Sequence, residues 1–148
     1  DKRGSLLVSE AFGGAANASA LSSYRFADAA AQTPLVVSAS VGTLQSAACW
    51  VAITPNGRFA YVTNTGSGSV SLYRIGRDGR IALGQSVAAL VPNSGPIDAY
   101  VSENGRKLFV LNGRVQSIAS YRIAADGSLS GAGGASNLPA GSVGLTAN

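Results

Sequence analysis

A unit of the chain recurs after 48 residues: between residues 54–83 and 102–131, eleven of the 30 positions are identical. The identities include Asn56/Asn104, Gly57/Gly105, Arg58/Arg106, Asn64/Asn112, Tyr73/Tyr121, Arg74/Arg122, Asp78/Asp126 and Gly79/Gly127. Other positions conserve the character of the side chain, as at Tyr61/Phe109. A period in the forties with four short strands per unit is typical of the blades of a β-propeller.

Turn residues divide the first copy of this repeat into four predicted strands. Pro55-Asn56-Gly57 and Asp78-Gly79 have turn composition, because proline fixes φ and the Asn-Gly and Asp-Gly pairs tolerate positive φ. The strands between the turns fall at about 51–54, 59–64, 70–75 and 81–83. In the strand expected at 70–75, bulky residues occupy both faces, as is typical of a sheet stacked between two other sheets.

These observations predict an all-β fold in which residues 1–148 form a single partial β-propeller domain. We expect about three four-stranded antiparallel blades, at approximately 1–40, 47–90 and 96–135. The first blade begins at its second strand and lacks an inner strand. Residues 138–148 resemble an inner strand, such as the one expected at 97–102, so we predict that they form a closing inner strand.

Three blades are too few to close a ring, because blades are wedges and a closed propeller has at least about four of them. The flanks of the terminal blades and one strand edge would stay uncovered. Two alternatives stay open. Either the segment belongs to a longer ring, or a homo-oligomer completes it, with two copies joining through their exposed blade faces, exchanging C-terminal strands and giving about six blades.

Composition excludes several classes of function. The net charge is +4, but the eleven basic residues are spread singly rather than gathered in a stripe, so we expect no nucleic-acid partner. No apolar run approaches membrane-spanning length, so we expect no membrane span. Histidine is absent, which excludes a histidine base, a Ser-His-Asp triad and a histidine metal site, and we expect neither a metal nor a cofactor. The single cysteine, Cys49, excludes an internal disulfide and is predicted to be a buried, inert thiol.

The second blade carries a family motif. Tyr61-Val62-Thr63-Asn64, followed by Gly66, Ser69 and Val70, resembles the Tyr-Val-Thr-Asn repeat of β-propellers. The patterns TPNGRFAYVTNTGSGSVSLYRI and SENGRKLFVLNGRVQSIASYRI resemble the lactonase family of seven-bladed propellers, which includes 6-phosphogluconolactonase-like enzymes and a fungal carboxymuconate cyclase. The resemblance covers nearly the whole chain and implies the three C-terminal blades of such a ring. We further expect a bacterial protein, with a periplasmic or secreted location favoured over a cytoplasmic one.

Glu10 is the candidate catalytic residue. Lactone hydrolysis needs a base that activates water, and the resemblance implies one here, because Glu10 ends the second strand of its blade where lactonase-like sequences often carry Asn-Glu. Apolar neighbours favour a raised pKa for this carboxyl. The alternative is a structural carboxylate that fixes the glycine-rich loop at 11–20. Depending on one gap, Glu10 matches Asn64 or Thr65 of the next blade, and a shift of one residue would reverse its face.

Three further residues are candidates for ligand binding. The inner strands begin Ala48-Cys49-Trp50 and Pro96-Ile97-Asp98 and lack the Pro-Arg-His pattern that is frequent in the family. Trp50 would stack on a sugar ring or pack between blades, and Asp98 would face the channel or be satisfied by strand amides. Arg114 would hold a phosphorylated substrate, or be a solvated turn residue one position away from the family's Asn-Arg-Gly arginine.

Two classes of function follow. The first is a lactonase-like propeller that binds a small-molecule or carbohydrate-like ligand, or that serves as a scaffold. The second is a 6-phosphogluconolactonase-like hydrolase of a sugar lactone with a carboxylate base, an activity that only the family resemblance implies. The absence of histidine and of the family's Arg-Gly pattern favours the first class for this chain.

Overall fold

The computed structural model describes residues 4–28 and 30–147; residues 1–3, 29 and 148, and with them the predicted opening of the first blade, lie outside the described residues. The described part consists of β-strands with two short 3₁₀ turns, η1 (Phe12–Gly14) and η2 (Gly113–Val115). The strands are β1 (Ser5–Glu10), β2 (Ala20–Arg25), β3 (Leu35–Gly42), β4 (Ala48–Ile53), β5 (Phe59–Asn64), β6 (Ser69–Ile75), β7 (Ile81–Leu90), β8 (Pro96–Val101), β9 (Lys107–Asn112), β10 (Ser117–Ile123) and β11 (Leu129–Ala135).

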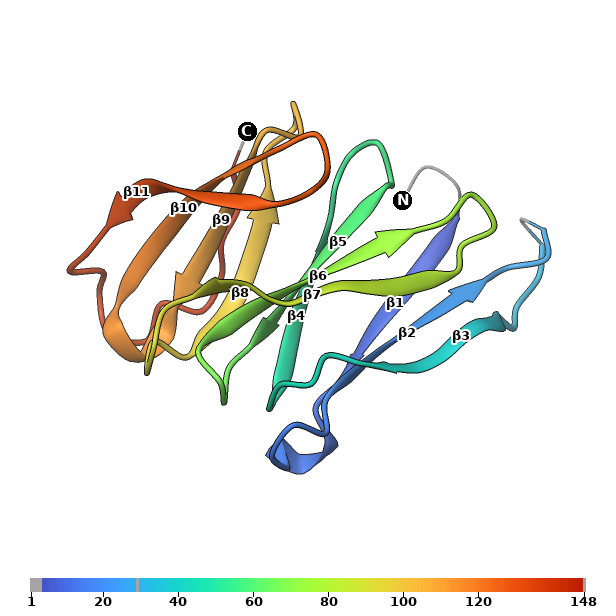
Figure 1. Ribbon diagram of the computed structural model, residues 1–148, viewed down its shortest axis with the longest axis horizontal. Coiled ribbons are helices and arrows are strands. Elements are labelled where there is room, and N and C mark those ends of the chain that lie inside the picture. The colour runs from blue at the N-terminus through green and yellow to red at the C-terminus, as the bar shows by residue number, and fades with distance from the viewer. Residues whose placement is uncertain (1–3, 29, 148) are drawn as a thin grey trace.

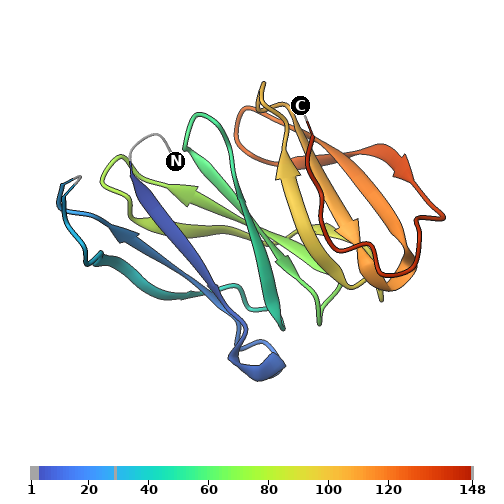
Figure 2. The same cartoon turned by 180° about the vertical axis from the view of Figure 1, so that it is seen from behind.

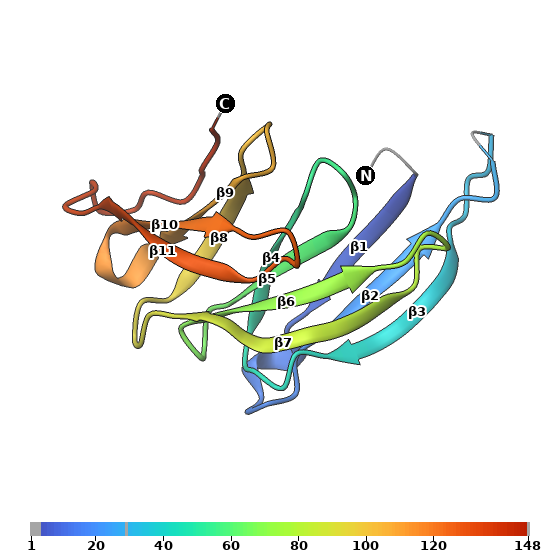
Figure 3. The same ribbon diagram turned by 45° about the horizontal axis from the view of Figure 1, so that its top comes forward.

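The strands form three antiparallel sheets whose order follows the chain: β1-β2-β3, β4-β5-β6-β7 and β8-β9-β10-β11 (Figure 1). The three sheets lie side by side in chain order, in a fan-shaped arrangement that is called the fan below (Figure 3). This arrangement confirms the predicted all-β fold of propeller blades. The first blade has three strands, because no strand precedes β1 among the described residues to serve as its inner partner.

The second and third strands pair in the same register in all three sheets, and this decides whether Glu10 matches Asn64 or Thr65. The second and third strands of the blades begin and end at the pairs Ser5–Arg25, Phe59–Arg74 and Lys107–Arg122. From these pairs, Glu10 occupies the same place in its blade as Asn64 and Asn112 in theirs. Glu10 therefore corresponds to Asn64, and the alternative match to Thr65 is wrong.

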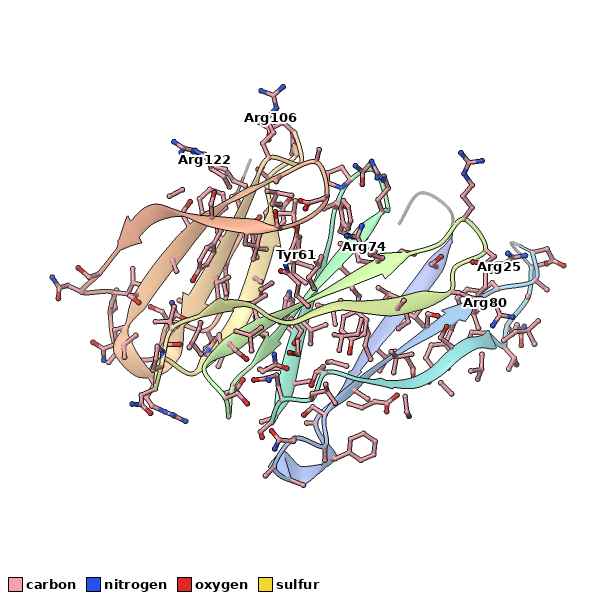
Figure 4. The ribbon with its side chains drawn as sticks, viewed as in Figure 1. Arg25, Tyr61, Arg74, Arg80, Arg106 and Arg122 are labelled. Carbon is pink, nitrogen blue, oxygen red and sulfur yellow. The ribbon has the colours of Figure 1, made fainter. Side chains whose placement is uncertain are left out.

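Neighbouring blades are joined by apolar clusters and by two tyrosine hydroxyls. The ring of Tyr73 packs in the cluster between the first two blades. The ring of Tyr61, labelled in Figure 4, packs in the cluster between the second and third. The Tyr73 hydroxyl donates to the carbonyl oxygen of Val41 at 2.7 Å, and the Tyr61 hydroxyl donates to that of Gly127 at 2.8 Å. Both bonds cross from one sheet to the next, so they fix how the blades sit against each other.

The turn at Gly127 has to be glycine because of the same packing. Its φ is +90°, and a Cβ atom there would lie 2.7 Å from the ring of Phe59 in the second blade. The guanidinium groups of Arg58 and Arg74 lie 5.3 and 5.7 Å from the centre of that ring. The glycine of this Asp-Gly turn and the two arginines of the second blade are thus explained by packing around Phe59.

The C-terminal segment forms no strand within the single chain. Residues 136–147 are irregular apart from one turn, and the closing inner strand expected at 138–148 stays a prediction about a completed ring. The segment instead runs beside β8 (Figure 2), and the Leu145 N–H donates to the Asp98 carboxylate at 2.7 Å. Within the described residues the segment pairs with no strand of the three sheets.

We predict that Tyr61→Phe and Tyr73→Phe each lower the free energy of unfolding by about 1–2 kcal/mol, because each leaves a carbonyl of the neighbouring blade without its donor. Urea denaturation followed by circular dichroism measures this change. Tyr121→Phe is the matched control, since within the described residues its hydroxyl bonds to no other blade, and we expect a change below about 0.5 kcal/mol. Equal losses in all three variants would contradict the role of the hydroxyls.

Alkaline pH should destabilise the fold through the same two residues. Burial raises the pKa of Tyr61 and of Tyr73, and the nearby carboxylates of Asp126 and Glu10, respectively, raise them further. Tyrosine in the unfolded chain titrates near pH 10, so above that pH the unfolded state binds fewer protons than the folded one. The stabilisation is complete below about pH 10 and is lost as the pH rises. We expect a steeper fall in unfolding free energy between about pH 9 and 11 for the wild type than for Tyr61→Phe/Tyr73→Phe.

Candidate functional site

The inner strands β4 and β8 border a groove of about 680 Å³. Its lining comes from both strands and the turns that follow them: Trp50, Val51, Ala52, Ile53, Pro55, Ala99, Tyr100, Val101 and Glu103. The groove is mainly apolar, with an indole at one end and a carboxylate at the other. Such a concave surface with few polar groups is what small-molecule sites require.

A bulge exposes Trp50 in this groove. The register of β4 against β5 shifts between Ala48 and Val51, so the adjacent side chains of Cys49 and Trp50 are both exposed rather than alternating. The backbone N–H of Trp50 donates to the Thr63 hydroxyl at 2.9 Å. The residue as a whole is 50% exposed. Half of Trp50 is therefore open to the groove between the second and third blades.

Cys49 corrects a prediction. The sequence favoured a buried thiol, but Cys49 is exposed, because the same bulge turns it out of the sheet. Its Sγ lies 3.5 Å from the carbonyl oxygen of Ile97 on β8. Ser9 of β1 also reaches this strand, since its hydroxyl donates to the Cys49 carbonyl at 2.6 Å. These contacts hold β1, β4 and β8 together at one end of the sheets.

Glu10 is held by hydroxyl groups of its own blade. Ser22 of β2 and Ser40 of β3 donate to different oxygens of the carboxylate, Ser40 at 2.7 Å. The Ser40 N–H in turn donates to the Ser22 hydroxyl at 2.8 Å, at a point where Ser40 has φ +43°. Glu10 thus ties the third and outer strands together. Its bonds do not run to the glycine-rich loop, as the structural alternative had supposed.

The equivalent residue of the second blade has the same role. Asn64 is fully buried and donates to the hydroxyls of Ser71 and Ser69 at 2.9 and 3.2 Å. Ser71 stands where Ser22 stands in the first blade. The Glu10 position is therefore a place where a polar side chain crosses between strands, and Glu10 differs from Asn64 by its charge and its partial exposure.

Asp98 is buried and satisfied by backbone amides. It is 4% exposed, and its carboxylate accepts from the Ala99 N–H at 2.6 Å and from the Leu145 N–H at 2.7 Å. This is the arrangement expected of a structural carboxylate. Asp98 lies under the C-terminal segment and does not line the β4–β8 groove.

Arg114 lies in η2 at the end where β8 begins. It is exposed, and its N–H donates to the Ser94 carbonyl at 3.0 Å. It borders a separate hollow of about 350 Å³, together with Thr65, Ile97 and residues 141–143 of the C-terminal segment. The four residues that the sequence nominated therefore do not converge: of Glu10, Trp50, Asp98 and Arg114, only Trp50 lines the β4–β8 groove.

Sequence reasoning missed Tyr100 and Glu103, which border the groove with Trp50. In the 48-residue repeat they align with Ala52 and Pro55, so the two copies differ in residue type at these positions in and after the inner strand. These differences between the copies were the signal that could have identified Tyr100 and Glu103 as candidates. Among the described residues there is no cluster of three or more acidic or cysteine side chains that could hold a metal ion. The same residues contain no helix whose length and apolarity would suffice to cross a membrane.

Comparison with known proteins supports the fold. No model of a protein family matches the chain, and no curated protein matches it. A protein of unknown function from Desulfotomaculum acetoxidans is similar over 90% of this chain and 39% of its own, with a TM-score of 0.73 and 19% identity. A candidate 6-phosphogluconolactonase from Bacteroides fragilis is similar over 78% of this chain and 32% of its own, with a TM-score of 0.63 and 15% identity. The periplasmic gluconolactonase of Pseudomonas aeruginosa is similar over 85% of this chain and 36% of its own, with a TM-score of 0.54 and 27% identity.

The chain therefore has a lactonase-like propeller fold. It spans about two fifths of the length of the Desulfotomaculum protein and about a third of the Bacteroides protein, at 39% and 32%. At such low identities the similarity describes the fold and leaves activity to be argued from the site.

We predict that Glu10→Ala lowers the free energy of unfolding by about 1–2 kcal/mol, because two hydroxyls then lose a charged acceptor. Glu103→Ala is the matched control, since this carboxylate is exposed on a turn, and its change should stay below about 0.5 kcal/mol. Chemical denaturation at neutral pH compares the two. If Glu10→Ala is as stable as the control, the carboxylate does not tie the strands of its blade together.

Proposed function

We propose that this chain is a ligand-binding segment of a lactonase-like propeller of the Tyr-Val-Thr-Asn type. The ligand is a small, uncharged carbohydrate-like molecule such as a sugar lactone, and the β4–β8 groove binds it. The observation that carries this proposal is the half-exposed indole of Trp50, which a bulge presents at the rim of an apolar groove.

The chemistry of the groove fits such a ligand. An exposed indole offers a flat apolar face on which the C–H face of a sugar ring stacks. The Glu103 carboxylate at the far end of the groove is an acceptor for sugar hydroxyls. The inner edges of β4 and β8 add backbone groups, because within the described residues each of these strands is paired on one side only.

The contacts of the remaining candidates favour binding over hydrolysis by this chain alone. A general base has to reach the attacking water, but the Glu10 carboxylate already accepts from Ser22 and Ser40. Donors for an oxyanion are also needed, and Arg114, the candidate cation, borders a different hollow from Trp50.

The second candidate function is hydrolysis of a sugar lactone with Glu10 as the base. It is favoured by the fold, since the Pseudomonas protein described above is a gluconolactonase. Comparing wild type with Glu10→Gln in a δ-gluconolactone hydrolysis assay separates the two candidates. Turnover by the wild type that Glu10→Gln abolishes would establish the second candidate, and absence of turnover with retained binding would support the first.

Ligand binding can be read from the protein's own fluorescence, because Trp50 is the single tryptophan of the chain. We predict a saturable change in its emission on titration with δ-gluconolactone. Glu103→Gln should weaken binding about tenfold, which corresponds to about 1.4 kcal/mol for one lost hydrogen bond to a charged group. Glu10→Gln is the matched control and should leave the affinity unchanged. A wild-type titration without any change in emission would contradict the proposal.

A further inference from the structure

The peptide unit that joins Cys49 to Trp50 is hydrogen-bonded on both sides by side-chain hydroxyls. Its carbonyl accepts from the Ser9 hydroxyl at 2.6 Å, and its N–H donates to the Thr63 hydroxyl at 2.9 Å. The carbonyl and the N–H of a trans peptide point in opposite directions. Ser9 on β1 and Thr63 on β5 therefore hold one peptide plane from opposite sides, and this pair is called the hydroxyl clamp below.

The hydroxyl clamp lies at the bulge that exposes Trp50. On β4 two residues, Cys49 and Trp50, stand between consecutive ladder pairs, whereas on β5 only Thr63 stands between them. A bulge of this kind interrupts the backbone ladder, so its amides need other hydrogen-bond partners. The Thr63 hydroxyl provides that partner for the Trp50 N–H, and it thereby holds the bulge in one conformation.

The two hydroxyls occupy equivalent places in neighbouring blades. Glu10 and Asn64 are equivalent, so Ser9 and Thr63, which directly precede them, are equivalent too. Ser9 is partly buried on β1, which lies beside β4 (Figure 2), whereas Thr63 is fully buried within the second blade. One hydroxyl thus ties the bulge to the neighbouring blade, and the other ties it to its own sheet.

The third blade has a bulge at the same place but no hydroxyl opposite it. Leu111 stands where Thr63 stands, and Asp98 stands where Trp50 stands. Asp98 is 4% exposed, and its own carboxylate accepts from the Ala99 N–H at 2.6 Å. A bulge alone therefore does not present its side chain to solvent. The exposed side chain occurs in the blade whose bulge is held by the hydroxyl clamp.

We propose that Ser9 and Thr63 are positioning residues for ligand binding, because they fix the direction in which the indole of Trp50 projects into the β4–β8 groove. This inference rests on the proposed function, in which the indole stacks on the ligand. A fixed peptide plane sets the direction of the Cα–Cβ bond before the ligand arrives. Such preorganisation raises affinity, since less motion is lost on binding. Neither hydroxyl lines the groove, so its effect on the ligand passes through Trp50.

The motion of the indole in the ligand-free protein tests the hydroxyl clamp. Because Trp50 is the single tryptophan, time-resolved fluorescence anisotropy reports on this side chain alone. Thr63→Val removes the hydroxyl and keeps the shape of the side chain, so we expect a larger amplitude of local indole motion. Thr63→Ser retains the hydroxyl and should restore the wild-type amplitude. Thr43→Val is the matched control, since Thr43 is equally buried but its hydroxyl bonds to Gln45 and Ser19.

The affinity for δ-gluconolactone, measured from the emission of Trp50, tests the link to binding. We expect Thr63→Val to weaken binding about three- to tenfold, which corresponds to the net contribution of one hydrogen bond. Thr63→Ser and Thr43→Val should bind like the wild type. Ser9→Ala should also increase indole motion and weaken binding. Because Ser9 is partly exposed, this second variant tests the hydroxyl clamp even if the buried substitution prevents folding.

The ligand-free and ligand-bound measurements separate the two ideas. Unchanged indole motion in the folded variants that lack a clamp hydroxyl would overturn the positioning role, whether or not the wild type binds δ-gluconolactone. Increased indole motion with unchanged affinity would overturn the role of the hydroxyl clamp in binding. A wild type that does not bind would overturn the proposed function, and the anisotropy measurement would still decide whether the hydroxyl clamp orients Trp50.

Discussion

The flank of each blade has to be covered by the flank of another blade, and the rest of the structure follows from this constraint. Tyr61 and Tyr73 lie on opposite flanks of the second blade, and each donates its hydroxyl to a carbonyl of a different neighbour. These bonds fix both the separation and the register of the sheets. The second blade is covered on both sides and all six residues of β5 are buried, whereas β11, at one end of the fan, is mostly exposed.

Because the flanks are used for packing, chemistry is left to the inner edges and the turns. The bulge at the start of β4 releases Trp50 from the alternating pattern and presents it at the groove beside β8. A second bulge, between Pro96 and Asp98, turns the Asp98 carboxylate toward amides of its own strand and of the C-terminal segment. Two bulges at equivalent places thus give one exposed aromatic and one buried carboxylate, and only the first is available to a ligand.

The blades could be predicted from the sequence because their signals are local. Asn56-Gly57 and Asp78-Gly79 mark turns, and the 48-residue shift shows that the turns recur with the same strands between them. The site was less predictable, because pairing decides it. The bulge that exposes Cys49 and Trp50 arises from the pairing of β4 with β5, whereas the sequence had predicted a buried thiol. Residues 136–147 form no strand in the single chain, although their sequence resembles an inner strand, because a strand also needs a paired neighbour that a local pattern does not specify.

The position shared by Glu10, Asn64 and Asn112 connects the architecture with the chemistry. Asn64 is bound by two serines, whereas Asn112 is buried and, within the described residues, has no side-chain partner, since Ala119 stands where the second blade has Ser71. An unpartnered buried amide costs about 1–3 kcal/mol, which shows that the position is tolerated for reasons of packing even where its bonds are lost. Glu10 brings a charge to this position, and its carboxylate is held by Ser22 and Ser40 as the Asn64 amide is held by Ser69 and Ser71. The same position therefore serves as a structural tie in two of the blades, with a carboxylate in one and an amide in the other.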